Sequence, residues 1–397
     1  MSQTMIASVG WSAAADATTA GHEAAAHALE RCRHVRAALA IVLGSSWFDQ
    51  GPLLAGVRSV LRSAPIVGGS TEGEIVPEGP VTHHCVVLLL ASEGISASVG
   101  LGEAVDRVPR EAGQQAAYTA MRDFHGSPRM GFLLFGGGLT STSAEVLRGI
   151  QEVVGTGALI IGGMTGDALR LTRTSQYAND HVATQAVAGA LLGGLGKIGI
   201  GIEHGFAPIS GLRRITRARA NVLHALDGQP AASVYEEYFG PEHTRHIQRE
   251  GLTRQVVAYP LGIHLESSDR WLLRNVLAVG EDGSVTCTGE IVEGAWLQLM
   301  IGNRDLVLNA ASHAAQQAIR SLDRIACVLV FDSALRKTLL GYQHAAAEIT
   351  RIREIIGPST PLAGCYTYGE QAPLGAGPGD ELSATQTASI LVVAIGT

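Results

Sequence analysis

Runs of consecutive apolar residues alternate along the chain with apolar residues at helical spacing, and this alternation occurs three times. An uninterrupted apolar run is typical of a strand that is covered on both faces. After each run comes a one-sided apolar stripe, which predicts an amphipathic helix, and then a second apolar run that ends in a glycine-rich loop. The first runs lie at residues 38–43, 130–135 and 326–331, and a further strand pattern completes each copy at residues 85–90, 183–192 and 389–395.

The three copies predict an α/β protein built from repeated β-α-β-loop-β units. A short strand–helix–strand connection favours a right-handed parallel crossover. Residues 254–303 differ, because their alternating pattern and the turn-forming residues at 281–284 predict an antiparallel, strand-rich insertion. A second hairpin turn is expected at Asn179-Asp180. We therefore expect two packed, layered α/β halves, residues 1–225 and 226–397, with this insertion between repeats.

The glycine-rich loops carry the candidate chemistry. Gly68-x-x-Thr71-x-Gly73-Glu74 and Gly364-x-x-Thr367-x-Gly369-Glu370 share one pattern, and the second loop, with Thr165, reads as one residue shorter. Glycines let a ligand approach backbone N–H groups, threonine adds a hydroxyl and glutamate adds a negative charge. Because open α/β sheets bind ligands at strand ends, the loops predict a site for a zwitterion.

In such a site the ligand's ammonium would meet a glutamate, and its carboxylate would meet backbone amides or an arginine such as Arg274. Tyr366 and Tyr368 flank Thr367, and alternation in an extended segment would put both rings on one face. The alternative is structural, since the same threonines and glutamates could satisfy backbone groups of the turns. The full set of candidate ligand-binding residues is Gly69, Ser70, Thr71, Glu74, Thr165, Arg274, Cys365, Tyr366, Thr367 and Glu370.

Composition narrows the class of protein. The net charge is −7, from 29 Lys and Arg against 36 Asp and Glu, and no basic run suits a phosphate backbone. Residues 1–10 lack the segments of a secretion signal, and no window of strongly apolar residues predicts a membrane span. The five cysteines are scattered without a Cys-x-x-Cys pair, which suits a reducing cytosol. We expect a cytoplasmic protein with no nucleic-acid partner and no membrane span.

Four segments resemble the FIST family of sensory proteins. They are residues 67–74, residues 199–208 through 221–231, residues 269–274 with 292–294, and residues 361–370. The resemblance runs from about residue 36 to the end of the chain, with His204 at a position more often held by Gln. It implies a bacterial or archaeal signal-input module that binds small, amino acid-like ligands and acts on a separate histidine kinase or cyclic-dinucleotide enzyme.

Two further hypotheses stay open. Some stand-alone members of the family are haem proteins that sense nitric oxide, and an axial imidazole could come from His204, His181 or His264. A cysteine-dependent hydrolase would need Cys365 as its nucleophile, with a base nearby and a depressed pKa. No Gly-x-Ser-x-Gly occurs, so we expect no enzymatic activity. Gly136-Gly137-Gly138, before a helix near Ser143, could hold an anion, although a tight turn is the simpler interpretation.

Overall fold

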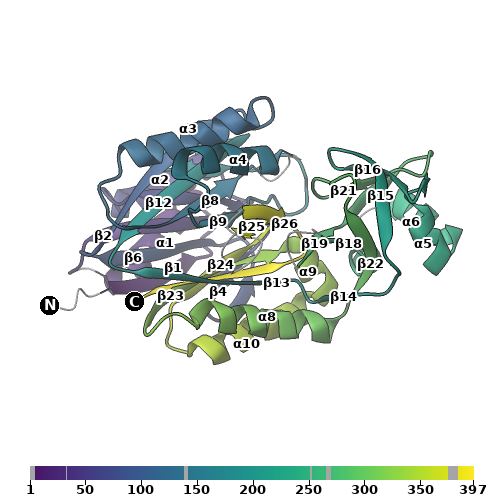
Figure 1. The fold of residues 1–397 in the computed structure, drawn as a ribbon. Coiled ribbons are helices and arrows are strands. Elements are labelled where there is room, and N and C mark those ends of the chain that lie inside the picture. Colours follow the sequence, from purple (N-terminus) through teal and green to yellow (C-terminus); the bar gives the residue numbers. More distant parts are fainter. Residues whose placement is uncertain (1–4, 33, 138–141, 251–252, 265–269, 374–382) are drawn as a thin grey trace.

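The computed structural model describes the chain except residues 1–4, 33, 138–141, 251–252, 265–269 and 374–382. It confirms the α/β class, because three six-stranded sheets with helices outside them form the body of the molecule. A fourth, nine-stranded sheet forms the insertion. Figure 1 shows the insertion extending from one end of the body, with both chain termini near the opposite end.

The three sheets of the body share one topology. In each, the first three strands are antiparallel neighbours, the third and fourth are parallel, and an antiparallel hairpin follows. Sheet 1 has the order β1 (Met5–Ser12), β6 (Cys85–Ser92), β2 (Ala37–Ser45), β3 (Ile66–Thr71), β10 (Gln176–Ala178) and β11 (His181–Ala183). Sheet 2 has β7 (Ile95–Glu103), β12 (Ala186–Gly194), β8 (Arg129–Gly136), β9 (Ile160–Met164), β25 (Glu370–Pro373) and β26 (Ser383–Gln386). Sheet 3 has β13 (Lys197–Glu203), β27 (Ile390–Gly396), β23 (Ile325–Ser333), β24 (Leu362–Thr367), β4 (Glu74–Val76) and β5 (Gly79–Val81).

The hairpin that completes each sheet comes from a different unit of the chain. We define unit 1 as residues 5–92, unit 2 as residues 95–194, and unit 3 as residues 197–203 with 304–396. The β4–β5 hairpin of unit 1 completes sheet 3, the β10–β11 hairpin of unit 2 completes sheet 1, and the β25–β26 hairpin of unit 3 completes sheet 2. The repeat units are therefore joined by a cyclic, threefold exchange of hairpins.

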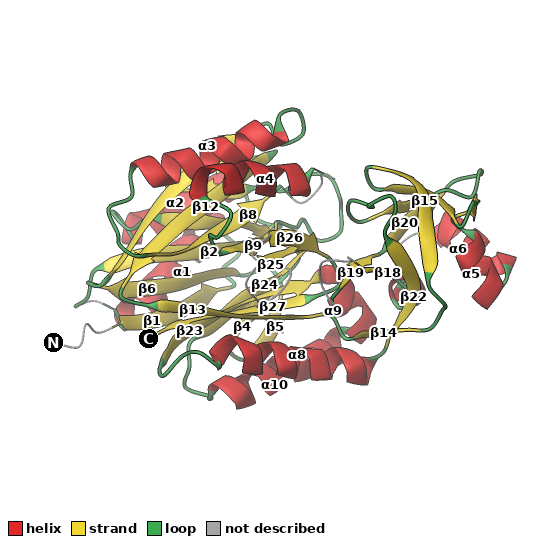
Figure 2. Cartoon of the chain, in the orientation of Figure 1, coloured by secondary structure: helices red, strands yellow, loops and turns green. Residues whose placement is uncertain are grey.

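Two long helices cover the outer face of each sheet, as Figure 2 shows. They are α1 (Ala17–Glu30) and α2 (Gln50–Val60) in unit 1, α3 (Pro109–Arg122) and α4 (Ser143–Val154) in unit 2, and α8 (Arg304–Ile319) and α10 (Tyr342–Ile356) in unit 3. Unit 3 has one additional helix, α9 (Ala334–Leu340), between β23 and α10. This helix lies between the loops and the insertion.

The apolar runs are continuous because their strands are buried on both faces. Along β2, Leu39, Ile41 and Leu43 belong to a central core shared by the three sheets, whereas Ala40 and Val42 pack on the helix side. This two-residue alternation is the geometry of a strand between two cores. The central core contains residues of all three units and includes a ring contact between units 2 and 3.

The insertion, residues 206–302, lies between β13 and α8 of unit 3. It comprises β14 (Phe206–Pro208), β15 (Arg213–Arg219), β16 (Val222–Leu226), β17 (Gln229–Pro230), α5 (Ser233–Phe239), α6 (Pro241–Glu250), α7 (Arg254–Val257), β18 (Leu261–His264), β19 (Trp271–Arg274), β20 (Val276–Val279), β21 (Val285–Cys287) and β22 (Trp296–Gly302). The expected turns at 281–284 and 179–180 join β20 to β21 and β10 to β11. The strand-rich region begins at residue 206, well before the expected residue 254. The sequence pattern missed this start because the arginines of β15 hide the alternation of apolar and polar residues. A small apolar cluster joins Val257 of the insertion to Leu339 and Leu340 of α9.

Candidate ligand-binding site

The first glycine of each loop is required by strand packing. A Cβ added at Gly68 would lie 1.8 Å from a carbonyl oxygen of the parallel neighbour β2. Gly162 and Gly364 hold the same position on β9 and β24, where the corresponding distances would be 2.0 and 2.4 Å. The predicted ligand residue Gly69 is equally packed, because its Cβ would lie 2.4 Å from the Thr165 side chain of unit 2. These glycines therefore allow backbone segments of the protein, rather than a ligand, to approach.

The threonine and glutamate of the first and third loops are bonded to each other. In unit 3, Thr367 Oγ1 donates to Glu370 Oε1 at 2.8 Å, and Glu370 Oε2 accepts from the N–H and hydroxyl of Ser389 at 3.2 and 2.6 Å. In unit 1, Thr71 bonds to Glu74 in the same way, and Glu74 Oε2 accepts from the N–H of His84 at 3.1 Å. Each glutamate ties the start of the departing hairpin to the next strand of its own unit.

Burial dominates the electrostatics of these two carboxyl groups. Glu74 and Glu370 are 0% exposed, and burial raises the pKa of each to about 7 against the lowering effect of their hydrogen bonds. Every carboxyl oxygen already has a partner within the protein. The geometry thus favours the structural alternative for Thr71, Glu74, Thr367 and Glu370.

The second loop is longer than the other two, which corrects the expectation that it is one residue short. Residues 166–175 separate Thr165 from Gln176, whereas only Glu72 and Gly73 separate Thr71 from Glu74. Gln176 is the true counterpart of the glutamates: its Nε2 donates to Thr165 Oγ1 at 2.7 Å, and its Oε1 accepts from the N–H of Ala186 at 3.1 Å. The count along the sequence failed because the partner of Thr165 is an amide that lies beyond an added segment.

The remaining predicted residues lie apart from any open site. Arg274 is buried and donates to the carbonyl oxygens of Glu290, Leu273 and Thr385, so it braces the insertion against β26, and burial lowers its pKa to about 10. Tyr366 is fully buried, with Lys337 Nζ 4.8 Å from its ring centroid. Tyr368 does not share that environment, because its hydroxyl bonds to Asp167 at 2.7 Å.

A groove opens at the carboxyl ends of β2 and β3, the edge where the rule for α/β sheets places ligands. Its volume is about 370 Å³, within the range of small-molecule sites. We call it the unit-1 groove. Its lining residues are Ser46, Phe48, Asp49, Gln50, Gly51, Ser70, Arg170, Thr172, Arg173, Ser175 and Val182. Of the predicted residues it contains Ser70, whose hydroxyl donates to the carbonyl oxygen of Gly166 at 2.8 Å.

The added segment of the second loop forms one wall of this groove. Asp167 holds it, because its carboxylate accepts from the N–H groups of Leu171, Thr172 and Arg173 at 3.0, 2.7 and 2.9 Å. Burial raises the pKa of Asp167, but the bonds from Tyr368 and from these N–H groups outweigh it and leave the pKa below its ordinary value. Asp167 is therefore a carboxylate at neutral pH, and the loop is organised around its charge.

Side chains of both charge signs line the groove. Arg170 lies on the loop wall, where it donates to the carbonyl oxygens of Asp167 and Ser46, both at 2.9 Å. Arg173 lies on the same wall, and no hydrogen bond or ion pair holds its guanidinium among the described residues. Asp49 caps α2 on the other wall, accepting from the N–H of Gly51 at 3.3 Å. Such a groove can bind a carboxylate at the arginines and an ammonium at the aspartate.

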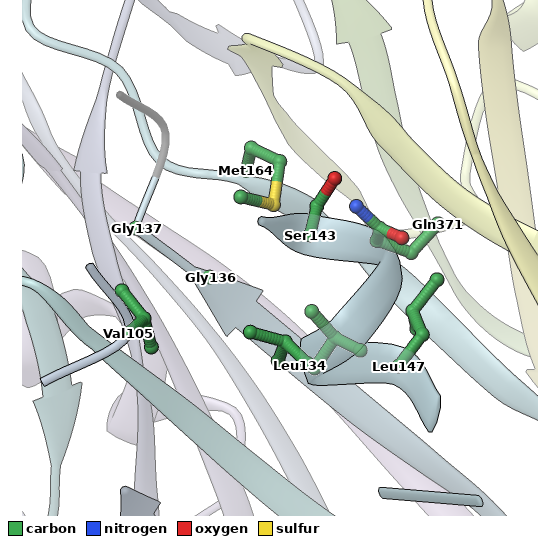
Figure 3. A pocket seen from close by; sticks show the side chains of 9 residues that line it. Val105, Leu134, Gly136, Gly137, Ser143, Leu147, Met164 and Gln371 are labelled. Atoms are coloured by element: carbon green, nitrogen blue, oxygen red, sulfur yellow. The ribbon is translucent and has the colours of Figure 1, made fainter. Parts of the chain in front are cut away.

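Equivalent positions in the other two units are filled. Ser70 of unit 1 corresponds to Met164 of unit 2 and Tyr366 of unit 3, since each accepts and donates the same backbone bonds between neighbouring loops. In unit 2 the Met164 side chain leaves a cavity of only about 10 Å³, the space of roughly one water (Figure 3). The cavity lies beside Gly136, Gly137 and the start of α4, while Gly138 lies outside the described residues.

In unit 3 the same place is occupied by a buried charge cluster. Arg336 donates to Asp332 at 2.8 Å, and it also bonds to Glu348 and to the carbonyl oxygen of Val307. All three charged side chains are 0% exposed. The size of the side chain two residues after the first loop glycine, at Ser70, Met164 or Tyr366, therefore decides whether a groove opens in that unit. That signal is legible in the sequence as Gly-Gly-Ser-Thr, Gly-Gly-Met-Thr and Gly-Cys-Tyr-Thr.

The three candidate histidines for a haem lie in three different surroundings. Burial, with Arg336 and Arg270, lowers the pKa of His204 to about 4, so its ring is neutral. Its Nδ1 accepts from the N–H of Phe206 at 2.9 Å, which puts the proton on Nε2 and leaves that nitrogen no lone pair for iron. His181 is exposed beside a hairpin turn, and His264 packs on Trp271 with ring centroids 5.0 Å apart. None of the three lines the groove or the cavity described above.

Cys365 is a poor nucleophile. It is buried opposite Glu74, and burial, followed by the charges of Glu74, Glu370 and Asp332, raises the pKa of its thiol.

The described part of the chain contains no group of three or more His, Cys, Asp or Glu side chains placed to hold a metal ion. Within the same residues, every helix is too short or too polar to cross a membrane.

The fold and the groove define a class of three-unit α/β protein with an open groove at the strand ends of unit 1. Family models for the FIST N domain and the FIST C domain match residues 38–229 and 231–373, so the chain belongs to the FIST family. FIST domains are generally sensory, ligand-binding domains. The boundary between the two matches falls at β17, inside the insertion.

Curated relatives are similar over much of the chain. An uncharacterised protein of Mycobacterium tuberculosis is 24% identical over 374 residues, which is 92% of this chain and 94% of that protein. An uncharacterised protein of Methanocaldococcus jannaschii is 24% identical over 266 residues, 62% of this chain and 50% of that protein.

Two solved structures align with weak similarity. Cyanuric acid hydrolase from A. caulinodans has a TM-score of 0.37 and 11% identity, covering 99% of this chain and 100% of that one. PurLQS from Thermotoga maritima has a TM-score of 0.23 and 9% identity, covering 99% of this chain and 72% of that one. At these TM-scores neither structure informs the function of the chain.

Proposed function

We propose that this protein is a cytoplasmic sensor that binds an amino acid-like zwitterion in the unit-1 groove and signals without catalysis. The observation that carries the proposal is the presence of Arg170, Arg173 and Asp49 together in the lining of a 370 Å³ groove at the strand ends. Two arginines favour a carboxylate, and Asp49 favours an ammonium at a distance from them. Phe48 adds an apolar surface for the ligand's side chain.

A contiguous set of contacts leads from the groove to the insertion. Asp167, which holds the groove wall, bonds to Tyr368 of unit 3, and the Tyr368 hydroxyl also lies 3.4 Å from Glu72 Oε2 of unit 1. Lys337 of α9 donates to the carbonyl oxygen of Glu72 at 3.0 Å. Since Leu339 and Leu340 of α9 pack against the insertion, ligand binding could bias how the insertion sits on the body.

The output of this movement would be read by a separate protein. We propose a histidine kinase or a cyclic-dinucleotide enzyme as that partner, because the family is generally sensory and the chain's insertion presents a distinct sheet beyond the body. The partner would distinguish the ligand-free and ligand-bound positions of the insertion.

The test is calorimetric titration of the full chain with each of the twenty proteinogenic amino acids. We expect at least one to bind, and Arg173→Ala to weaken that binding by about tenfold, the effect of losing one charge-assisted contact. Arg320→Ala removes an exposed arginine outside the groove and serves as the matched control. Absence of binding by every amino acid, or equal binding by Arg173→Ala, would refute the assignment.

A further inference from the structure

The cyclic exchange of hairpins creates a second kind of groove, at the seams between units. At the two seams that the structure describes in full, the last turn of a helix and the connection after it meet the first strand of the neighbouring unit and the turn of an exchanged hairpin. The groove between units 1 and 2 has a volume of about 430 Å³. It is lined by side chains from the end of α2 and the connection after it (residues 58–65), by β7 and by the β10–β11 turn. The groove between units 3 and 1 is lined by the end of α10, β1 and the β4–β5 turn, with a volume of about 720 Å³.

In the groove between units 1 and 2 the arginine is neutralised by the protein itself. Arg58, in the last turn of α2, donates to the carbonyl oxygens of Leu61 and Ala64 at 2.9 and 2.8 Å. Its Nε forms an ion pair with Asp180 in the turn of the exchanged hairpin. This groove therefore contains both the guanidinium of Arg58 and the carboxylate of Asp180 that balances its charge.

In the groove between units 3 and 1 the arginine lacks that carboxylate. Arg353, in the last turn of α10, donates through Nη2 to the carbonyl oxygen of Pro358 at 2.8 Å. The Nε atoms of both arginines have no hydrogen-bond partner among the described residues, but only Arg58 has an ion pair with a carboxylate there. The hairpin register places Glu78 where the other hairpin has Asp180, and Glu78 lines the groove without an ion pair to Arg353 in the described part of the chain.

We propose that the groove between units 3 and 1 is a second small-molecule site, for a carboxylic acid with a flat apolar portion. The ligand's carboxylate pairs with the guanidinium of Arg353, as the carboxylate of Asp180 pairs with that of Arg58. Arg31, at the rim of the groove, adds positive charge. Trp11 and Pro361 in the same groove offer surface to the apolar portion. Because Arg353 forms no ion pair with a carboxylate among the described residues, a bound carboxylate supplies the counter-charge that Asp180 supplies to Arg58. The groove volume of about 720 Å³ lies within the range of small-molecule sites.

The probe for this site is 4-phenylbutyrate, with its neutral amide as the matched control ligand. In calorimetric titrations of the full chain we expect 4-phenylbutyrate to bind at one site and the amide to bind at least tenfold more weakly. Arg353→Ala should weaken binding of the acid by tenfold or more. Arg353→Gln, which keeps a donor for the carbonyl oxygen of Pro358 but removes the charge, should do the same and guards against a folding defect. Arg351→Ala, on the same helix but bonded to Asn309, should bind as the unaltered protein does.

Two results would overturn the proposal: equal binding of acid and amide, or unchanged binding in both Arg353 variants. A lack of binding by the unaltered protein at millimolar 4-phenylbutyrate would do so as well. Arg173→Ala separates the two sites, because a change in the unit-1 groove should leave 4-phenylbutyrate binding unaltered. The seam site and the proposed amino-acid site can therefore fail independently of each other.

Discussion

Gln176 of unit 2 and Glu370 of unit 3 hold the same place in their units. Each begins an exchanged hairpin, bonds to the threonine of its loop, and accepts from the backbone N–H at the start of the next strand. A neutral amide and a carboxyl group thus do the same structural work in one molecule. It follows that a negative charge is not required at this position.

The first prediction is that Glu370→Gln keeps the fold and stabilises it above neutral pH. The folded-state pKa of Glu370, about 7, is raised by burial above its ordinary 4.5. Between these values the folded protein holds the extra proton, so the contribution of Glu370 to stability is largest below pH 4.5 and is lost as the pH rises towards 7. The glutamine needs no proton, so thermal unfolding at pH 8 should shift upwards, by up to about 3 kcal/mol in free energy.

The control for this prediction is Glu370→Ala. It leaves the N–H and the hydroxyl of Ser389 without their acceptor in a buried site, so it should destabilise the fold by about 2–4 kcal/mol. Thermal unfolding from pH 4.5 to 8 measures both variants. A Glu370→Gln protein that unfolds like Glu370→Ala would show that the glutamate acts through its charge after all.

Much of the architecture is legible from the sequence, because each strand of the repeat has to be apolar on both faces. The three units, the strand-rich insertion and the two hairpin turns follow from that constraint and from turn chemistry. The exchange of hairpins does not follow, because a hairpin's pattern is the same whichever sheet receives it. Thr71 and Glu74 are placed correctly on a loop, but the sequence cannot tell whether they bond to each other or to a ligand.

The groove itself was only partly predictable. Ser70 belongs to the predicted set, but Arg170, Arg173 and Asp49 do not, because they come from an added loop and a helix cap with no repeat pattern. The difference between Ser70, Met164 and Tyr366 was visible in the aligned repeats and marks the open unit. The sequence alone does not link this difference to a groove, because only the structure shows that the three side chains occupy equivalent positions in their units.

The second prediction tests that marker. Ser70→Met should fill the unit-1 groove as Met164 fills its counterpart, and so abolish amino-acid binding with the fold retained. Ser70→Ala removes the hydroxyl bonds to the carbonyl oxygen of Gly166 and from the N–H of Ser175 but not the space, so binding should persist with a stability loss of about 1–3 kcal/mol. Titration calorimetry and circular dichroism on both variants measure these effects. Undiminished binding in Ser70→Met would place the ligand elsewhere.

The third prediction concerns the charge cluster of unit 3. Burial, then the charge of Glu348, raises the pKa of Asp332 well above its ordinary value, so the site disfavours a negative charge on this side chain. Asp332→Asn, which keeps an oxygen to accept from Arg336, should therefore change the thermal midpoint little. Arg336→Met leaves buried carboxyl groups without their counter-charge and should cost about 3–5 kcal/mol. Equal losses in the two variants, measured by thermal unfolding at pH 7, would show that the cluster needs the charge of Asp332.

The last prediction tests the link between the groove and unit 3. The Tyr368 hydroxyl donates to Asp167 and accepts from the N–H groups of Asp167 and Leu169, at 3.2 and 2.8 Å. This bonding holds a segment in which Ala168, Leu169 and Leu171 have positive φ values of 59°, 54° and 52°, each costing about 1–2 kcal/mol without compensation. Tyr368→Phe keeps the ring but releases the segment.

We therefore expect faster hydrogen exchange in residues 166–175 of Tyr368→Phe, with the three sheets unchanged. Amino-acid affinity should fall by about fivefold to tenfold, since the arginine wall has to be ordered on binding. Tyr118→Phe, on the exposed surface of α3, controls for loss of a tyrosine hydroxyl as such. If Tyr368→Phe speeds exchange in the loop but leaves affinity unaltered, the loop does not contribute to the ligand site. If exchange in the insertion also rises on loss of the hydroxyl, the contacts through Glu72 and Lys337 couple the two regions energetically.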